Sequence, residues 1–153
     1  MHYIQQQKAK RKRSVTSVLF LDIKGAFDHV SKPKLLAAMQ GLQLPQSLIS
    51  WVDSFLSERV ARLMFDGKIQ DETPIEIGIP QGSPISPILF LIYTRDIWQS
   101  QAFQLSYMED FSIALSSTSA RKNCRALKSI AESLIEKAAE KGVQFEPAKT
   151  ELI

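Results

Sequence analysis

Acidic side chains occur at two places that a fold could bring together. Asp22 lies near the end of an apolar run, and Glu109 and Asp110 lie between two short segments that each favour a strand. Unpaired carboxylates repel one another, so a cluster of them needs divalent cations as counter-charges. Two magnesium ions held about 3.5–4 Å apart are the apparatus of nucleotidyl transfer. These three residues are therefore the first candidates for metal ligands.

The surrounding pattern predicts the elements that position these acids. The predicted strands cover residues 15–23, 60–65, 68–71, 104–108, 111–115 and 143–145. The predicted helices cover residues 31–41, 45–56, 85–98 and 119–141. Ser31 and Ser119 are expected to cap two of these helices, Gly142 to end the last, and Asp66-Gly67 to turn an early hairpin.

The order of these elements is that of the split β-α-β motif in ferredoxin-like folds. We therefore predict an α+β fold, with an antiparallel sheet that carries its helices on one face. In that topology the first strand and the later hairpin are neighbours in one sheet. Asp22 is then expected to lie beside Glu109 and Asp110 for a topological reason.

Composition indicates one globular domain behind a basic lead segment. The chain has 153 residues, of which 44% are hydrophobic and 23% are charged, with a net charge of +3. Because five cations lie within residues 8–13, the remainder is mildly acidic. We predict a loose basic segment over residues 1–14 and a domain over residues 15–153.

The cysteine count and the length of the apolar runs indicate the cellular compartment of the protein. Cys124 is the only cysteine, which excludes an internal disulfide and favours a reducing compartment. The apolar run over residues 85–93 is shorter than the ~20 residues that cross a bilayer. We expect an intracellular protein, in the cytoplasm or the nucleus, that does not enter a membrane.

Four segments together resemble the palm of reverse transcriptases, most closely those of non-LTR (LINE-like) retrotransposons. The resemblance covers residues 15–153. The segments are Phe20-Leu21-Asp22-Ile23-Lys24-Gly25-Ala26-Phe27-Asp28, Gly78-Ile79-Pro80-Gln81-Gly82-Ser83-Pro84-Ile85-Ser86-Pro87, Tyr107-Met108-Glu109-Asp110, and residues 142–147 followed by Lys149-Thr150-Glu151.

The resemblance implies an RNA-directed DNA polymerase, a nucleotidyltransferase that joins deoxynucleotides to a primer 3′-hydroxyl. It assigns two Mg²⁺ ions, or Mn²⁺ in their place, to Asp22, Glu109, Asp110 and the backbone carbonyl of Ile23. It further assigns Lys149 as a proton donor near the leaving phosphates. The alternative is that Lys149 is an ordinary surface lysine without a catalytic role.

The same resemblance places four residues against the incoming deoxynucleoside triphosphate (dNTP) and the template. The ring of Phe27 would lie under the sugar and collide with a 2′-hydroxyl, although core packing is an alternative role. Gln81 would contact the nucleotide and help place the template base, while Gly82 and Ser83 allow the backbone to approach closely. The implied partners are an RNA template, a DNA primer and dNTP.

Two departures from the family pattern limit the expected activity. Glu109 stands where the family has aspartate, and its extra methylene displaces the carboxylate by up to about 1.5 Å. Since magnesium demands near-ideal octahedral geometry, we expect impaired catalysis. We also expect that this chain lacks most of the fingers and the whole thumb of a longer polyprotein.

Two other functions stay open on the sequence alone. One is a catalytically inactive nucleic-acid-binding or interaction module that derives from a retroelement and keeps the fold. The other is a group II intron maturase or bacterial retroelement enzyme, which shares the palm.

Overall fold

The computed structural model describes residues 14–98, 103–107 and 110–153. The chain divides into two compact units, and each is described by itself. The first unit takes Met1–Ala26 and Arg95–Ile153, and the second unit takes Phe27–Thr94.

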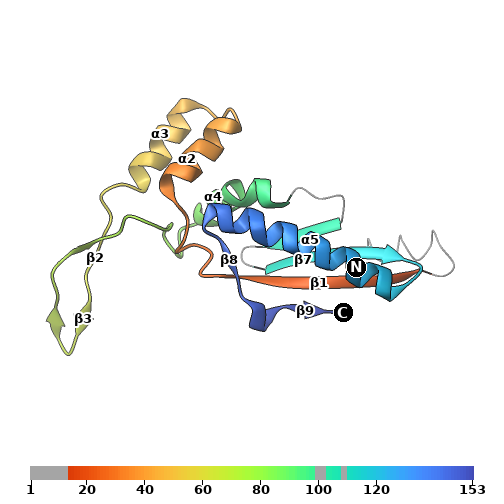
Figure 1. Cartoon of the computed structure of the whole chain (residues 1–153). Helices are drawn as coiled ribbons and strands as arrows, with labels where there is room; N and C mark the ends of the chain where they lie inside the picture. The colour runs from red at the N-terminus through yellow and green to blue at the C-terminus, as the bar shows by residue number, and fades with distance from the viewer. Residues whose placement is uncertain (1–13, 99–102, 108–109) are drawn as a thin grey trace. The chain divides into compact units, whose positions relative to one another are not determined.

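The first unit is an antiparallel sheet with one long helix on one face (Figure 1). Its strands run in the order β6-β7-β1-β8, and β9 also pairs with β1. The strands are β1 (Val15–Lys24), β6 (Phe103–Tyr107), β7 (Asp110–Ser117), β8 (Gln144–Phe145) and β9 (Glu151–Leu152). The helices are α5 (Ala120–Lys141) and the 3-10 turns η1 (Arg95–Trp98) and η2 (Pro147–Lys149).

Side chains of β1 alternate between the two faces of this sheet. Leu19, Leu21 and Ile23 are buried on the face that α5 covers, whereas Phe20 between them is 41% exposed on the other face. The buried stripe of α5, with Leu127 and Leu134, packs against the first set. One face of the sheet therefore belongs to the core, and the opposite face is open.

The second unit contains three helices and two short strand pairs. The helices are α2 (Lys32–Gly41), α3 (Gln46–Phe55) and α4 (Ser86–Thr94). The strand pairs are β2 (Val60–Ala61) with β5 (Thr73–Pro74), and β3 (Met64–Phe65) with β4 (Lys68–Ile69). The fully buried side chains of this unit include Val30, Leu35, Met39, Val52, Phe90 and Tyr93.

Residues 60–74 form a narrow ribbon of paired strands that exposes large apolar side chains. The turn at Asp66-Gly67 has positive φ at both residues, as a two-residue hairpin loop requires. Leu63, Phe65 and Ile69 are 66%, 79% and 68% exposed, respectively. Little of this apolar surface is removed from water within the second unit.

Backbone hydrogen bonds tie the chain after β1 to the segment that enters α4. The Gly78 N–H donates to the Val30 carbonyl at 2.9 Å, and the Ile79 N–H donates to the Phe27 carbonyl at 2.8 Å. Gly78 has φ +85°, and a Cβ atom there would lie 3.0 Å from the carbonyl oxygens of Phe27 and Asp28. Only glycine permits this close approach of two backbone segments.

Several predicted details differ from the structure. The hydroxyls of Ser31 and Ser119 make no capping hydrogen bond. Pro33, in the first turn of α2, has no N–H to offer Ser31, and the Ser117 hydroxyl accepts the Ser119 N–H at 3.2 Å. The helix predicted over residues 85–98 ends at Thr94 and continues as the 3-10 turn η1.

The last strand, β9, also differs from the prediction. The sequence pattern does not predict the strand β9, because its two residues carry no periodicity. In the part of the chain that the structure describes, no helix is long and apolar enough to cross a membrane.

We expect Gly78→Ala to lower the free energy of unfolding by about 1–3 kcal/mol, because it combines backbone strain with a clash against two carbonyl oxygens. Chemical denaturation measures this change. Gly82→Ala is the matched control, since Gly82 has the same φ of +85° but no atom within 4 Å of the added Cβ. An equal loss in both variants would show that the close approach at Gly78 contributes nothing.

Candidate active site

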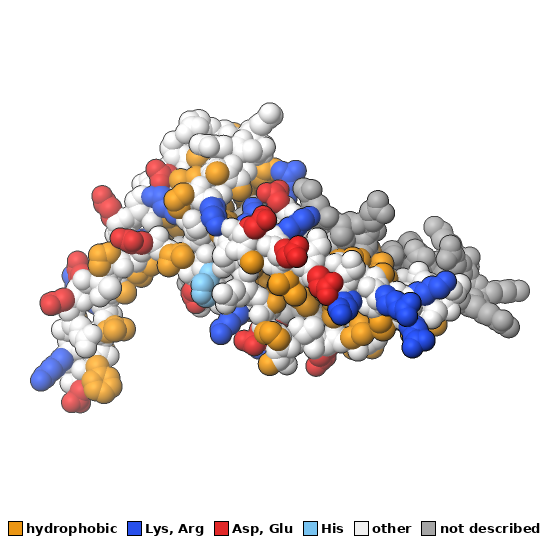
Figure 2. Space-filling model, in the orientation of Figure 1, with side chains coloured by type: hydrophobic (Ala, Val, Ile, Leu, Met, Phe, Trp, Pro, Cys, Tyr) orange, Lys and Arg blue, Asp and Glu red, His pale blue; other side chains and the backbone are white. Residues whose placement is uncertain are grey.

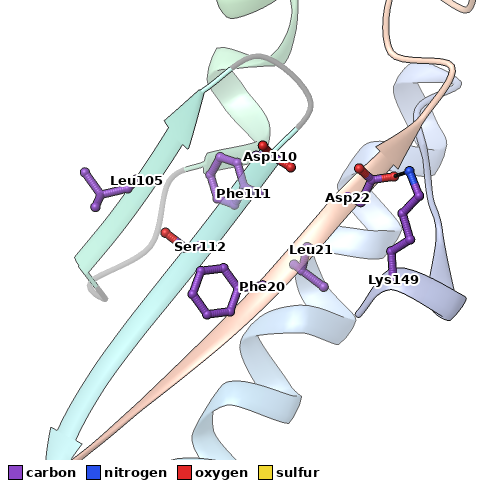
Figure 3. A pocket seen from close by; sticks show the side chains of 8 residues that line it. All are labelled: Phe20, Leu21, Asp22, Leu105, Asp110, Phe111, Ser112 and Lys149. Atoms are coloured by element: carbon purple, nitrogen blue, oxygen red, sulfur yellow. Dashed lines mark hydrogen bonds and ion pairs between the residues drawn. The ribbon is translucent and has the colours of Figure 1, made fainter. Parts of the chain in front are cut away.

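The pairing of β1 with β7 brings two of the predicted metal ligands together. Asp22 and Asp110 are directly opposite one another in the antiparallel register, at the end of the paired region. Because opposite residues of a strand pair share one face, both side chains lie on the open face with Phe20 (Figure 3). The predicted convergence of Asp22 and Asp110 is therefore present in the structure.

Backbone hydrogen bonds on the other edge of β1 show how close this pair is. The Glu146 N–H donates to the Asp22 carbonyl at 2.9 Å, and Val18 exchanges two hydrogen bonds with Ile153. Since successive strand residues point their backbone groups to alternate neighbours, Asp22 and Asp110 form a non-hydrogen-bonded pair, the closer of the two kinds, in which Cα atoms are typically about 4.5 Å apart. By the same alternation, the Ile23 carbonyl points to the β7 side of β1.

Lys149 supplies a positive charge to this pair from η2. Its Nζ lies 2.9 Å from Oδ2 of Asp22, whose side chain is 15% exposed (Figure 3). The hydrogen bond to Asp22 and the charge of that carboxylate raise the pKa of Lys149, with further contributions from Glu146 and Asp110, while lost hydration opposes the shift. Lys149 thus lies at the carboxylates, as an ion-pair partner of Asp22.

The acid pair lines a cavity of about 610 Å³ on the open face (Figure 3). Phe20 and Leu105 form part of its apolar lining, and Ser112 lies opposite Phe20 in the register. A cavity of this size and character suits a small ligand. Its polar groups are concentrated at the end where Asp22, Asp110 and Lys149 meet.

The donors in this cavity are oxygen ligands of the kind that divalent cations prefer. The carboxylates of Asp22 and Asp110 line the cavity and match the ligands that Mg²⁺ and Mn²⁺ take, and Oδ1 of Asp22 has no hydrogen bond among the described residues. Glu109, the third predicted ligand, lies outside the described residues. Within them, no three His, Cys, Asp or Glu side chains gather as a metal-binding group. The described donor set fits a divalent cation with two acids.

The second unit brings together the residues predicted to contact a nucleotide. The Gln81 amide donates to Oδ1 of Asp28 at 2.9 Å, next to the hydrogen bond between Ile79 and Phe27. The half-buried ring of Phe27 packs edge-on against Phe90, with centroids 5.5 Å apart. Phe27 therefore has both a packing contact and an accessible part.

The turn after Gln81 keeps the remaining two predicted residues near the surface. Gly82 is exposed with φ +85°, and Ser83 is half-buried. The Ser86 hydroxyl donates to the Pro80 carbonyl at 2.6 Å and closes the turn. These contacts give residues 80–86 a defined shape despite two prolines and a glycine.

Sequence reasoning missed Arg59. One guanidinium nitrogen donates to the carbonyls of Ile77 at 3.0 Å and Gly78 at 2.6 Å, just before the turn that holds Gln81. The Nε atom of Arg59 is buried without a hydrogen bond among the described residues. The available signal was a lone cation directly before a strand, which by itself also fits a surface residue.

Matches to known proteins extend over the whole chain. A family model described as "Reverse transcriptase (RNA-dependent DNA polymerase)" matches residues 1–153. The chain is 29% identical over 151 residues to the RNA-directed DNA polymerase from mobile element jockey of Drosophila funebris, and the match covers 93% of this chain. It is 33% identical over 96 residues, or 63% of this chain, to a Pol polyprotein from type-1 retrotransposable element R2 of Popillia japonica. Each match covers only 16% of the relative.

Solved structures confirm the predicted α+β polymerase fold. Apo telomerase from Candida tropicalis matches 99% of this chain with a TM-score of 0.73 and 15% identity, over 31% of that protein. Telomerase from Candida albicans, in complex with a fragment of telomeric RNA, matches 99% of this chain with a TM-score of 0.71 and 12% identity, over 29% of that protein.

Replacement of Asp22 by Asn is expected to lower the pKa of Lys149 towards its ordinary value of 10.5, because Asp22 is the largest cause of the shift. A raised pKa means that the ion pair stabilises the fold at neutral pH and stops doing so as the pH rises through that pKa. NMR titration of the lysine side chain measures the change. Glu146→Gln is the control and should lower the pKa less. No response to Asp22→Asn would contradict the ion pair.

Proposed function

Because the chain belongs to the reverse transcriptase (RNA-dependent DNA polymerase) family, we propose that residues 15–153 form the palm of an RNA-directed DNA polymerase from a non-LTR retrotransposon. The single observation that carries this proposal is the close pairing of Asp22 with Asp110 on the open face of the sheet. The proposed substrates are an RNA template, a DNA primer and dNTP. The cytoplasm or the nucleus is the proposed location.

The reaction we propose joins the primer 3′-oxygen to the α-phosphorus of dNTP and breaks the bond to pyrophosphate. Asp22, Glu109, Asp110 and the Ile23 carbonyl would hold two Mg²⁺ ions, or Mn²⁺. When bound, such ions neutralise phosphate charge and lower the pKa of the attacking hydroxyl. The opposite positions of Asp22 and Asp110 in the register of β1 and β7 support their joint role as ligands.

Lys149 is proposed as the proton donor to the leaving pyrophosphate. A lysine ammonium is protonated at neutral pH, as a proton donor requires, and the hydrogen bond to Asp22 raises the pKa of Lys149 further. Its side chain is 66% exposed, so the ammonium can reach a bound phosphate. The ion pair with Asp22 supports its place beside the metal ligands.

The nucleotide contacts are proposed for residues of the second unit. Phe27 would exclude a 2′-hydroxyl with the accessible part of its ring, and Gln81 would contact the incoming nucleotide and the template base. Gly82 and Ser83 would let the backbone approach the ligand. The hydrogen bonds that join residues 27–30 to residues 78–81 support this grouping.

Primer extension on an RNA template with Mn²⁺ tests the proposal directly. We expect Asp22→Asn and Asp110→Asn each to abolish dNTP incorporation, because each removes a charged ligand. Asp71→Asn, which alters an exposed acid of the ribbon, should leave it unchanged. Absence of both incorporation and Mn²⁺ binding in the parent chain would favour the inactive nucleic-acid-binding module instead.

Glu109 is proposed to slow the reaction, because its longer side chain misplaces a carboxylate. A misplacement of about 1 Å can cost on the order of 100-fold in rate. Glu109→Asp should therefore raise the rate of single-nucleotide incorporation by up to about 100-fold. Asp110→Glu, the reciprocal change on β7, should lower it. A Glu109→Asp variant no faster than its parent would contradict the geometric argument.

A further inference from the structure

The exposed face of α5 changes sign along its length. Arg121, Lys122, Arg125 and Lys128 are all exposed, and the first acidic residue of the helix is Glu132. Figure 2 shows Lys and Arg side chains gathered where α5 begins, and Asp and Glu side chains along its later turns. We call the four cations the α5 cation surface.

The helical repeat places these cations in a compact group. Arg121, Arg125 and Lys128 follow the i, i+4, i+7 spacing of one helical stripe, with Lys122 beside them. At 1.5 Å per residue, the stripe extends about 10 Å along the helix axis. Four positive charges within this length raise the local potential.

Within the residues that the structure describes, little of this charge is neutralised. Lys128 lies 3.8 Å from Glu132, and both side chains are well exposed, so the pair is weak. Among the described residues, Arg121, Lys122 and Arg125 make no ion pair. Most of the positive charge of the α5 cation surface is therefore available to an external partner.

The α5 cation surface lies on the face of the sheet opposite to the acid pair. α5 covers the side on which Leu19, Leu21 and Ile23 are buried, whereas Asp22 and Asp110 belong to the open side. A ligand on α5 is thus separated from the carboxylates by the sheet itself. It cannot be the primer end or the triphosphate that the acid pair would handle.

We propose that the α5 cation surface binds the phosphate backbone of duplex nucleic acid, as a site separate from the catalytic one. Arginine presents a planar fork of donors that matches phosphate oxygens. The exposed residue Thr118 precedes α5 and the exposed residue Ser129 follows Lys128 within it, so their hydroxyls can add hydrogen bonds to phosphate.

The neighbouring side chains argue against other anionic partners. A membrane-binding helix interleaves its cations with large apolar residues that enter the bilayer. Protein interfaces are commonly centred on buried aromatic anchors, and α5 contains no aromatic residue. The other exposed residues over positions 120–129 are small, namely Ala120, Ala126 and Ser129, and the exposed Ile135 lies seven residues beyond Lys128. A polar, highly charged surface without apolar anchors is typical of backbone contacts to nucleic acid.

Binding of a blunt duplex tests this proposal without any catalytic step, because a duplex without a recessed end offers no template for extension. Fluorescence anisotropy would follow labelled RNA and DNA duplexes as the full chain is titrated at several salt concentrations. We expect the triple variant Arg121→Glu, Lys122→Glu, Arg125→Glu to weaken binding at least about tenfold. The association constant K decreases as salt is added, so the slope of log K against log salt is negative. The magnitude of this slope should decrease by about 2–3, because each lost phosphate contact contributes about 0.9.

Matched variants make the outcome specific to the α5 cation surface, because one control position, Lys137, lies on α5 beyond that surface. The triple variant Lys68→Glu, Arg95→Glu, Lys137→Glu changes the net charge equally at exposed or half-buried positions outside the surface and should bind almost as the parent does. Acidic residues in the first turn of a helix are favourable, and circular dichroism would verify that α5 stays folded. Asp22→Asn should bind the duplex undiminished, whether or not the chain extends primers.

Three results would overturn the proposal. These are equal losses in the two triple variants, duplex binding that ignores the α5 substitutions, and binding of anionic phosphatidylserine vesicles that is as tight as duplex binding and equally sensitive to those substitutions. Binding of RNA alone, DNA alone or both duplexes supports it and identifies the source of the phosphates.

Discussion

The antiparallel register between β1 and β7 is the constraint on which the candidate site depends. Asp22 and Asp110 are separated by 87 residues of sequence, yet they are opposite one another because each pair from Val15–Ser117 onwards keeps the same register. A slip of one residue would turn Asp22 towards α5 and bury its charge in the core. Pairing on the other edge, where Glu146 bonds to the Asp22 carbonyl, holds β1 against such a slip. Backbone pairing thus determines where the charges lie.

One short stretch of chain contributes a residue to each of two chemically different groups. Asp22 ends the paired part of β1 next to β7, and Phe27 follows five residues later as the start of the second unit. The first group consists of carboxylates and an ammonium on strands and a 3-10 turn. The second is held by backbone hydrogen bonds that need glycine at position 78. The proposed metal ligands and the proposed nucleotide contacts therefore rest on separate structural supports.

The sequence predicts the parts of this arrangement that depend on pattern and topology. The apolar run over residues 15–23 predicts β1 within one residue, and Gly142 ends α5 in a left-handed conformation as expected. The neighbourhood of Asp22 and Asp110 follows from the order of the elements. The hydrogen bonds of Arg59 and the ion pair of Lys149 do not, because they depend on where irregular segments fold back. The hydroxyl of Ser31 makes no capping hydrogen bond, and the proline in the first turn removes one of the two N–H donors that could have reached it.

The ribbon over residues 60–74 has a consequence for handling the protein. Within the described chain, β3 and β4 pair only with each other, so each leaves one row of backbone groups without a strand partner. Leu63 and Phe65 carry apolar surface beside these bare edges, and Met64 and Ile69 carry it on the other side. Such a segment is a template for strand addition by further molecules. Among the described residues, this ribbon therefore combines bare strand edges with exposed apolar side chains, the two features that favour self-association of a chain at high concentration.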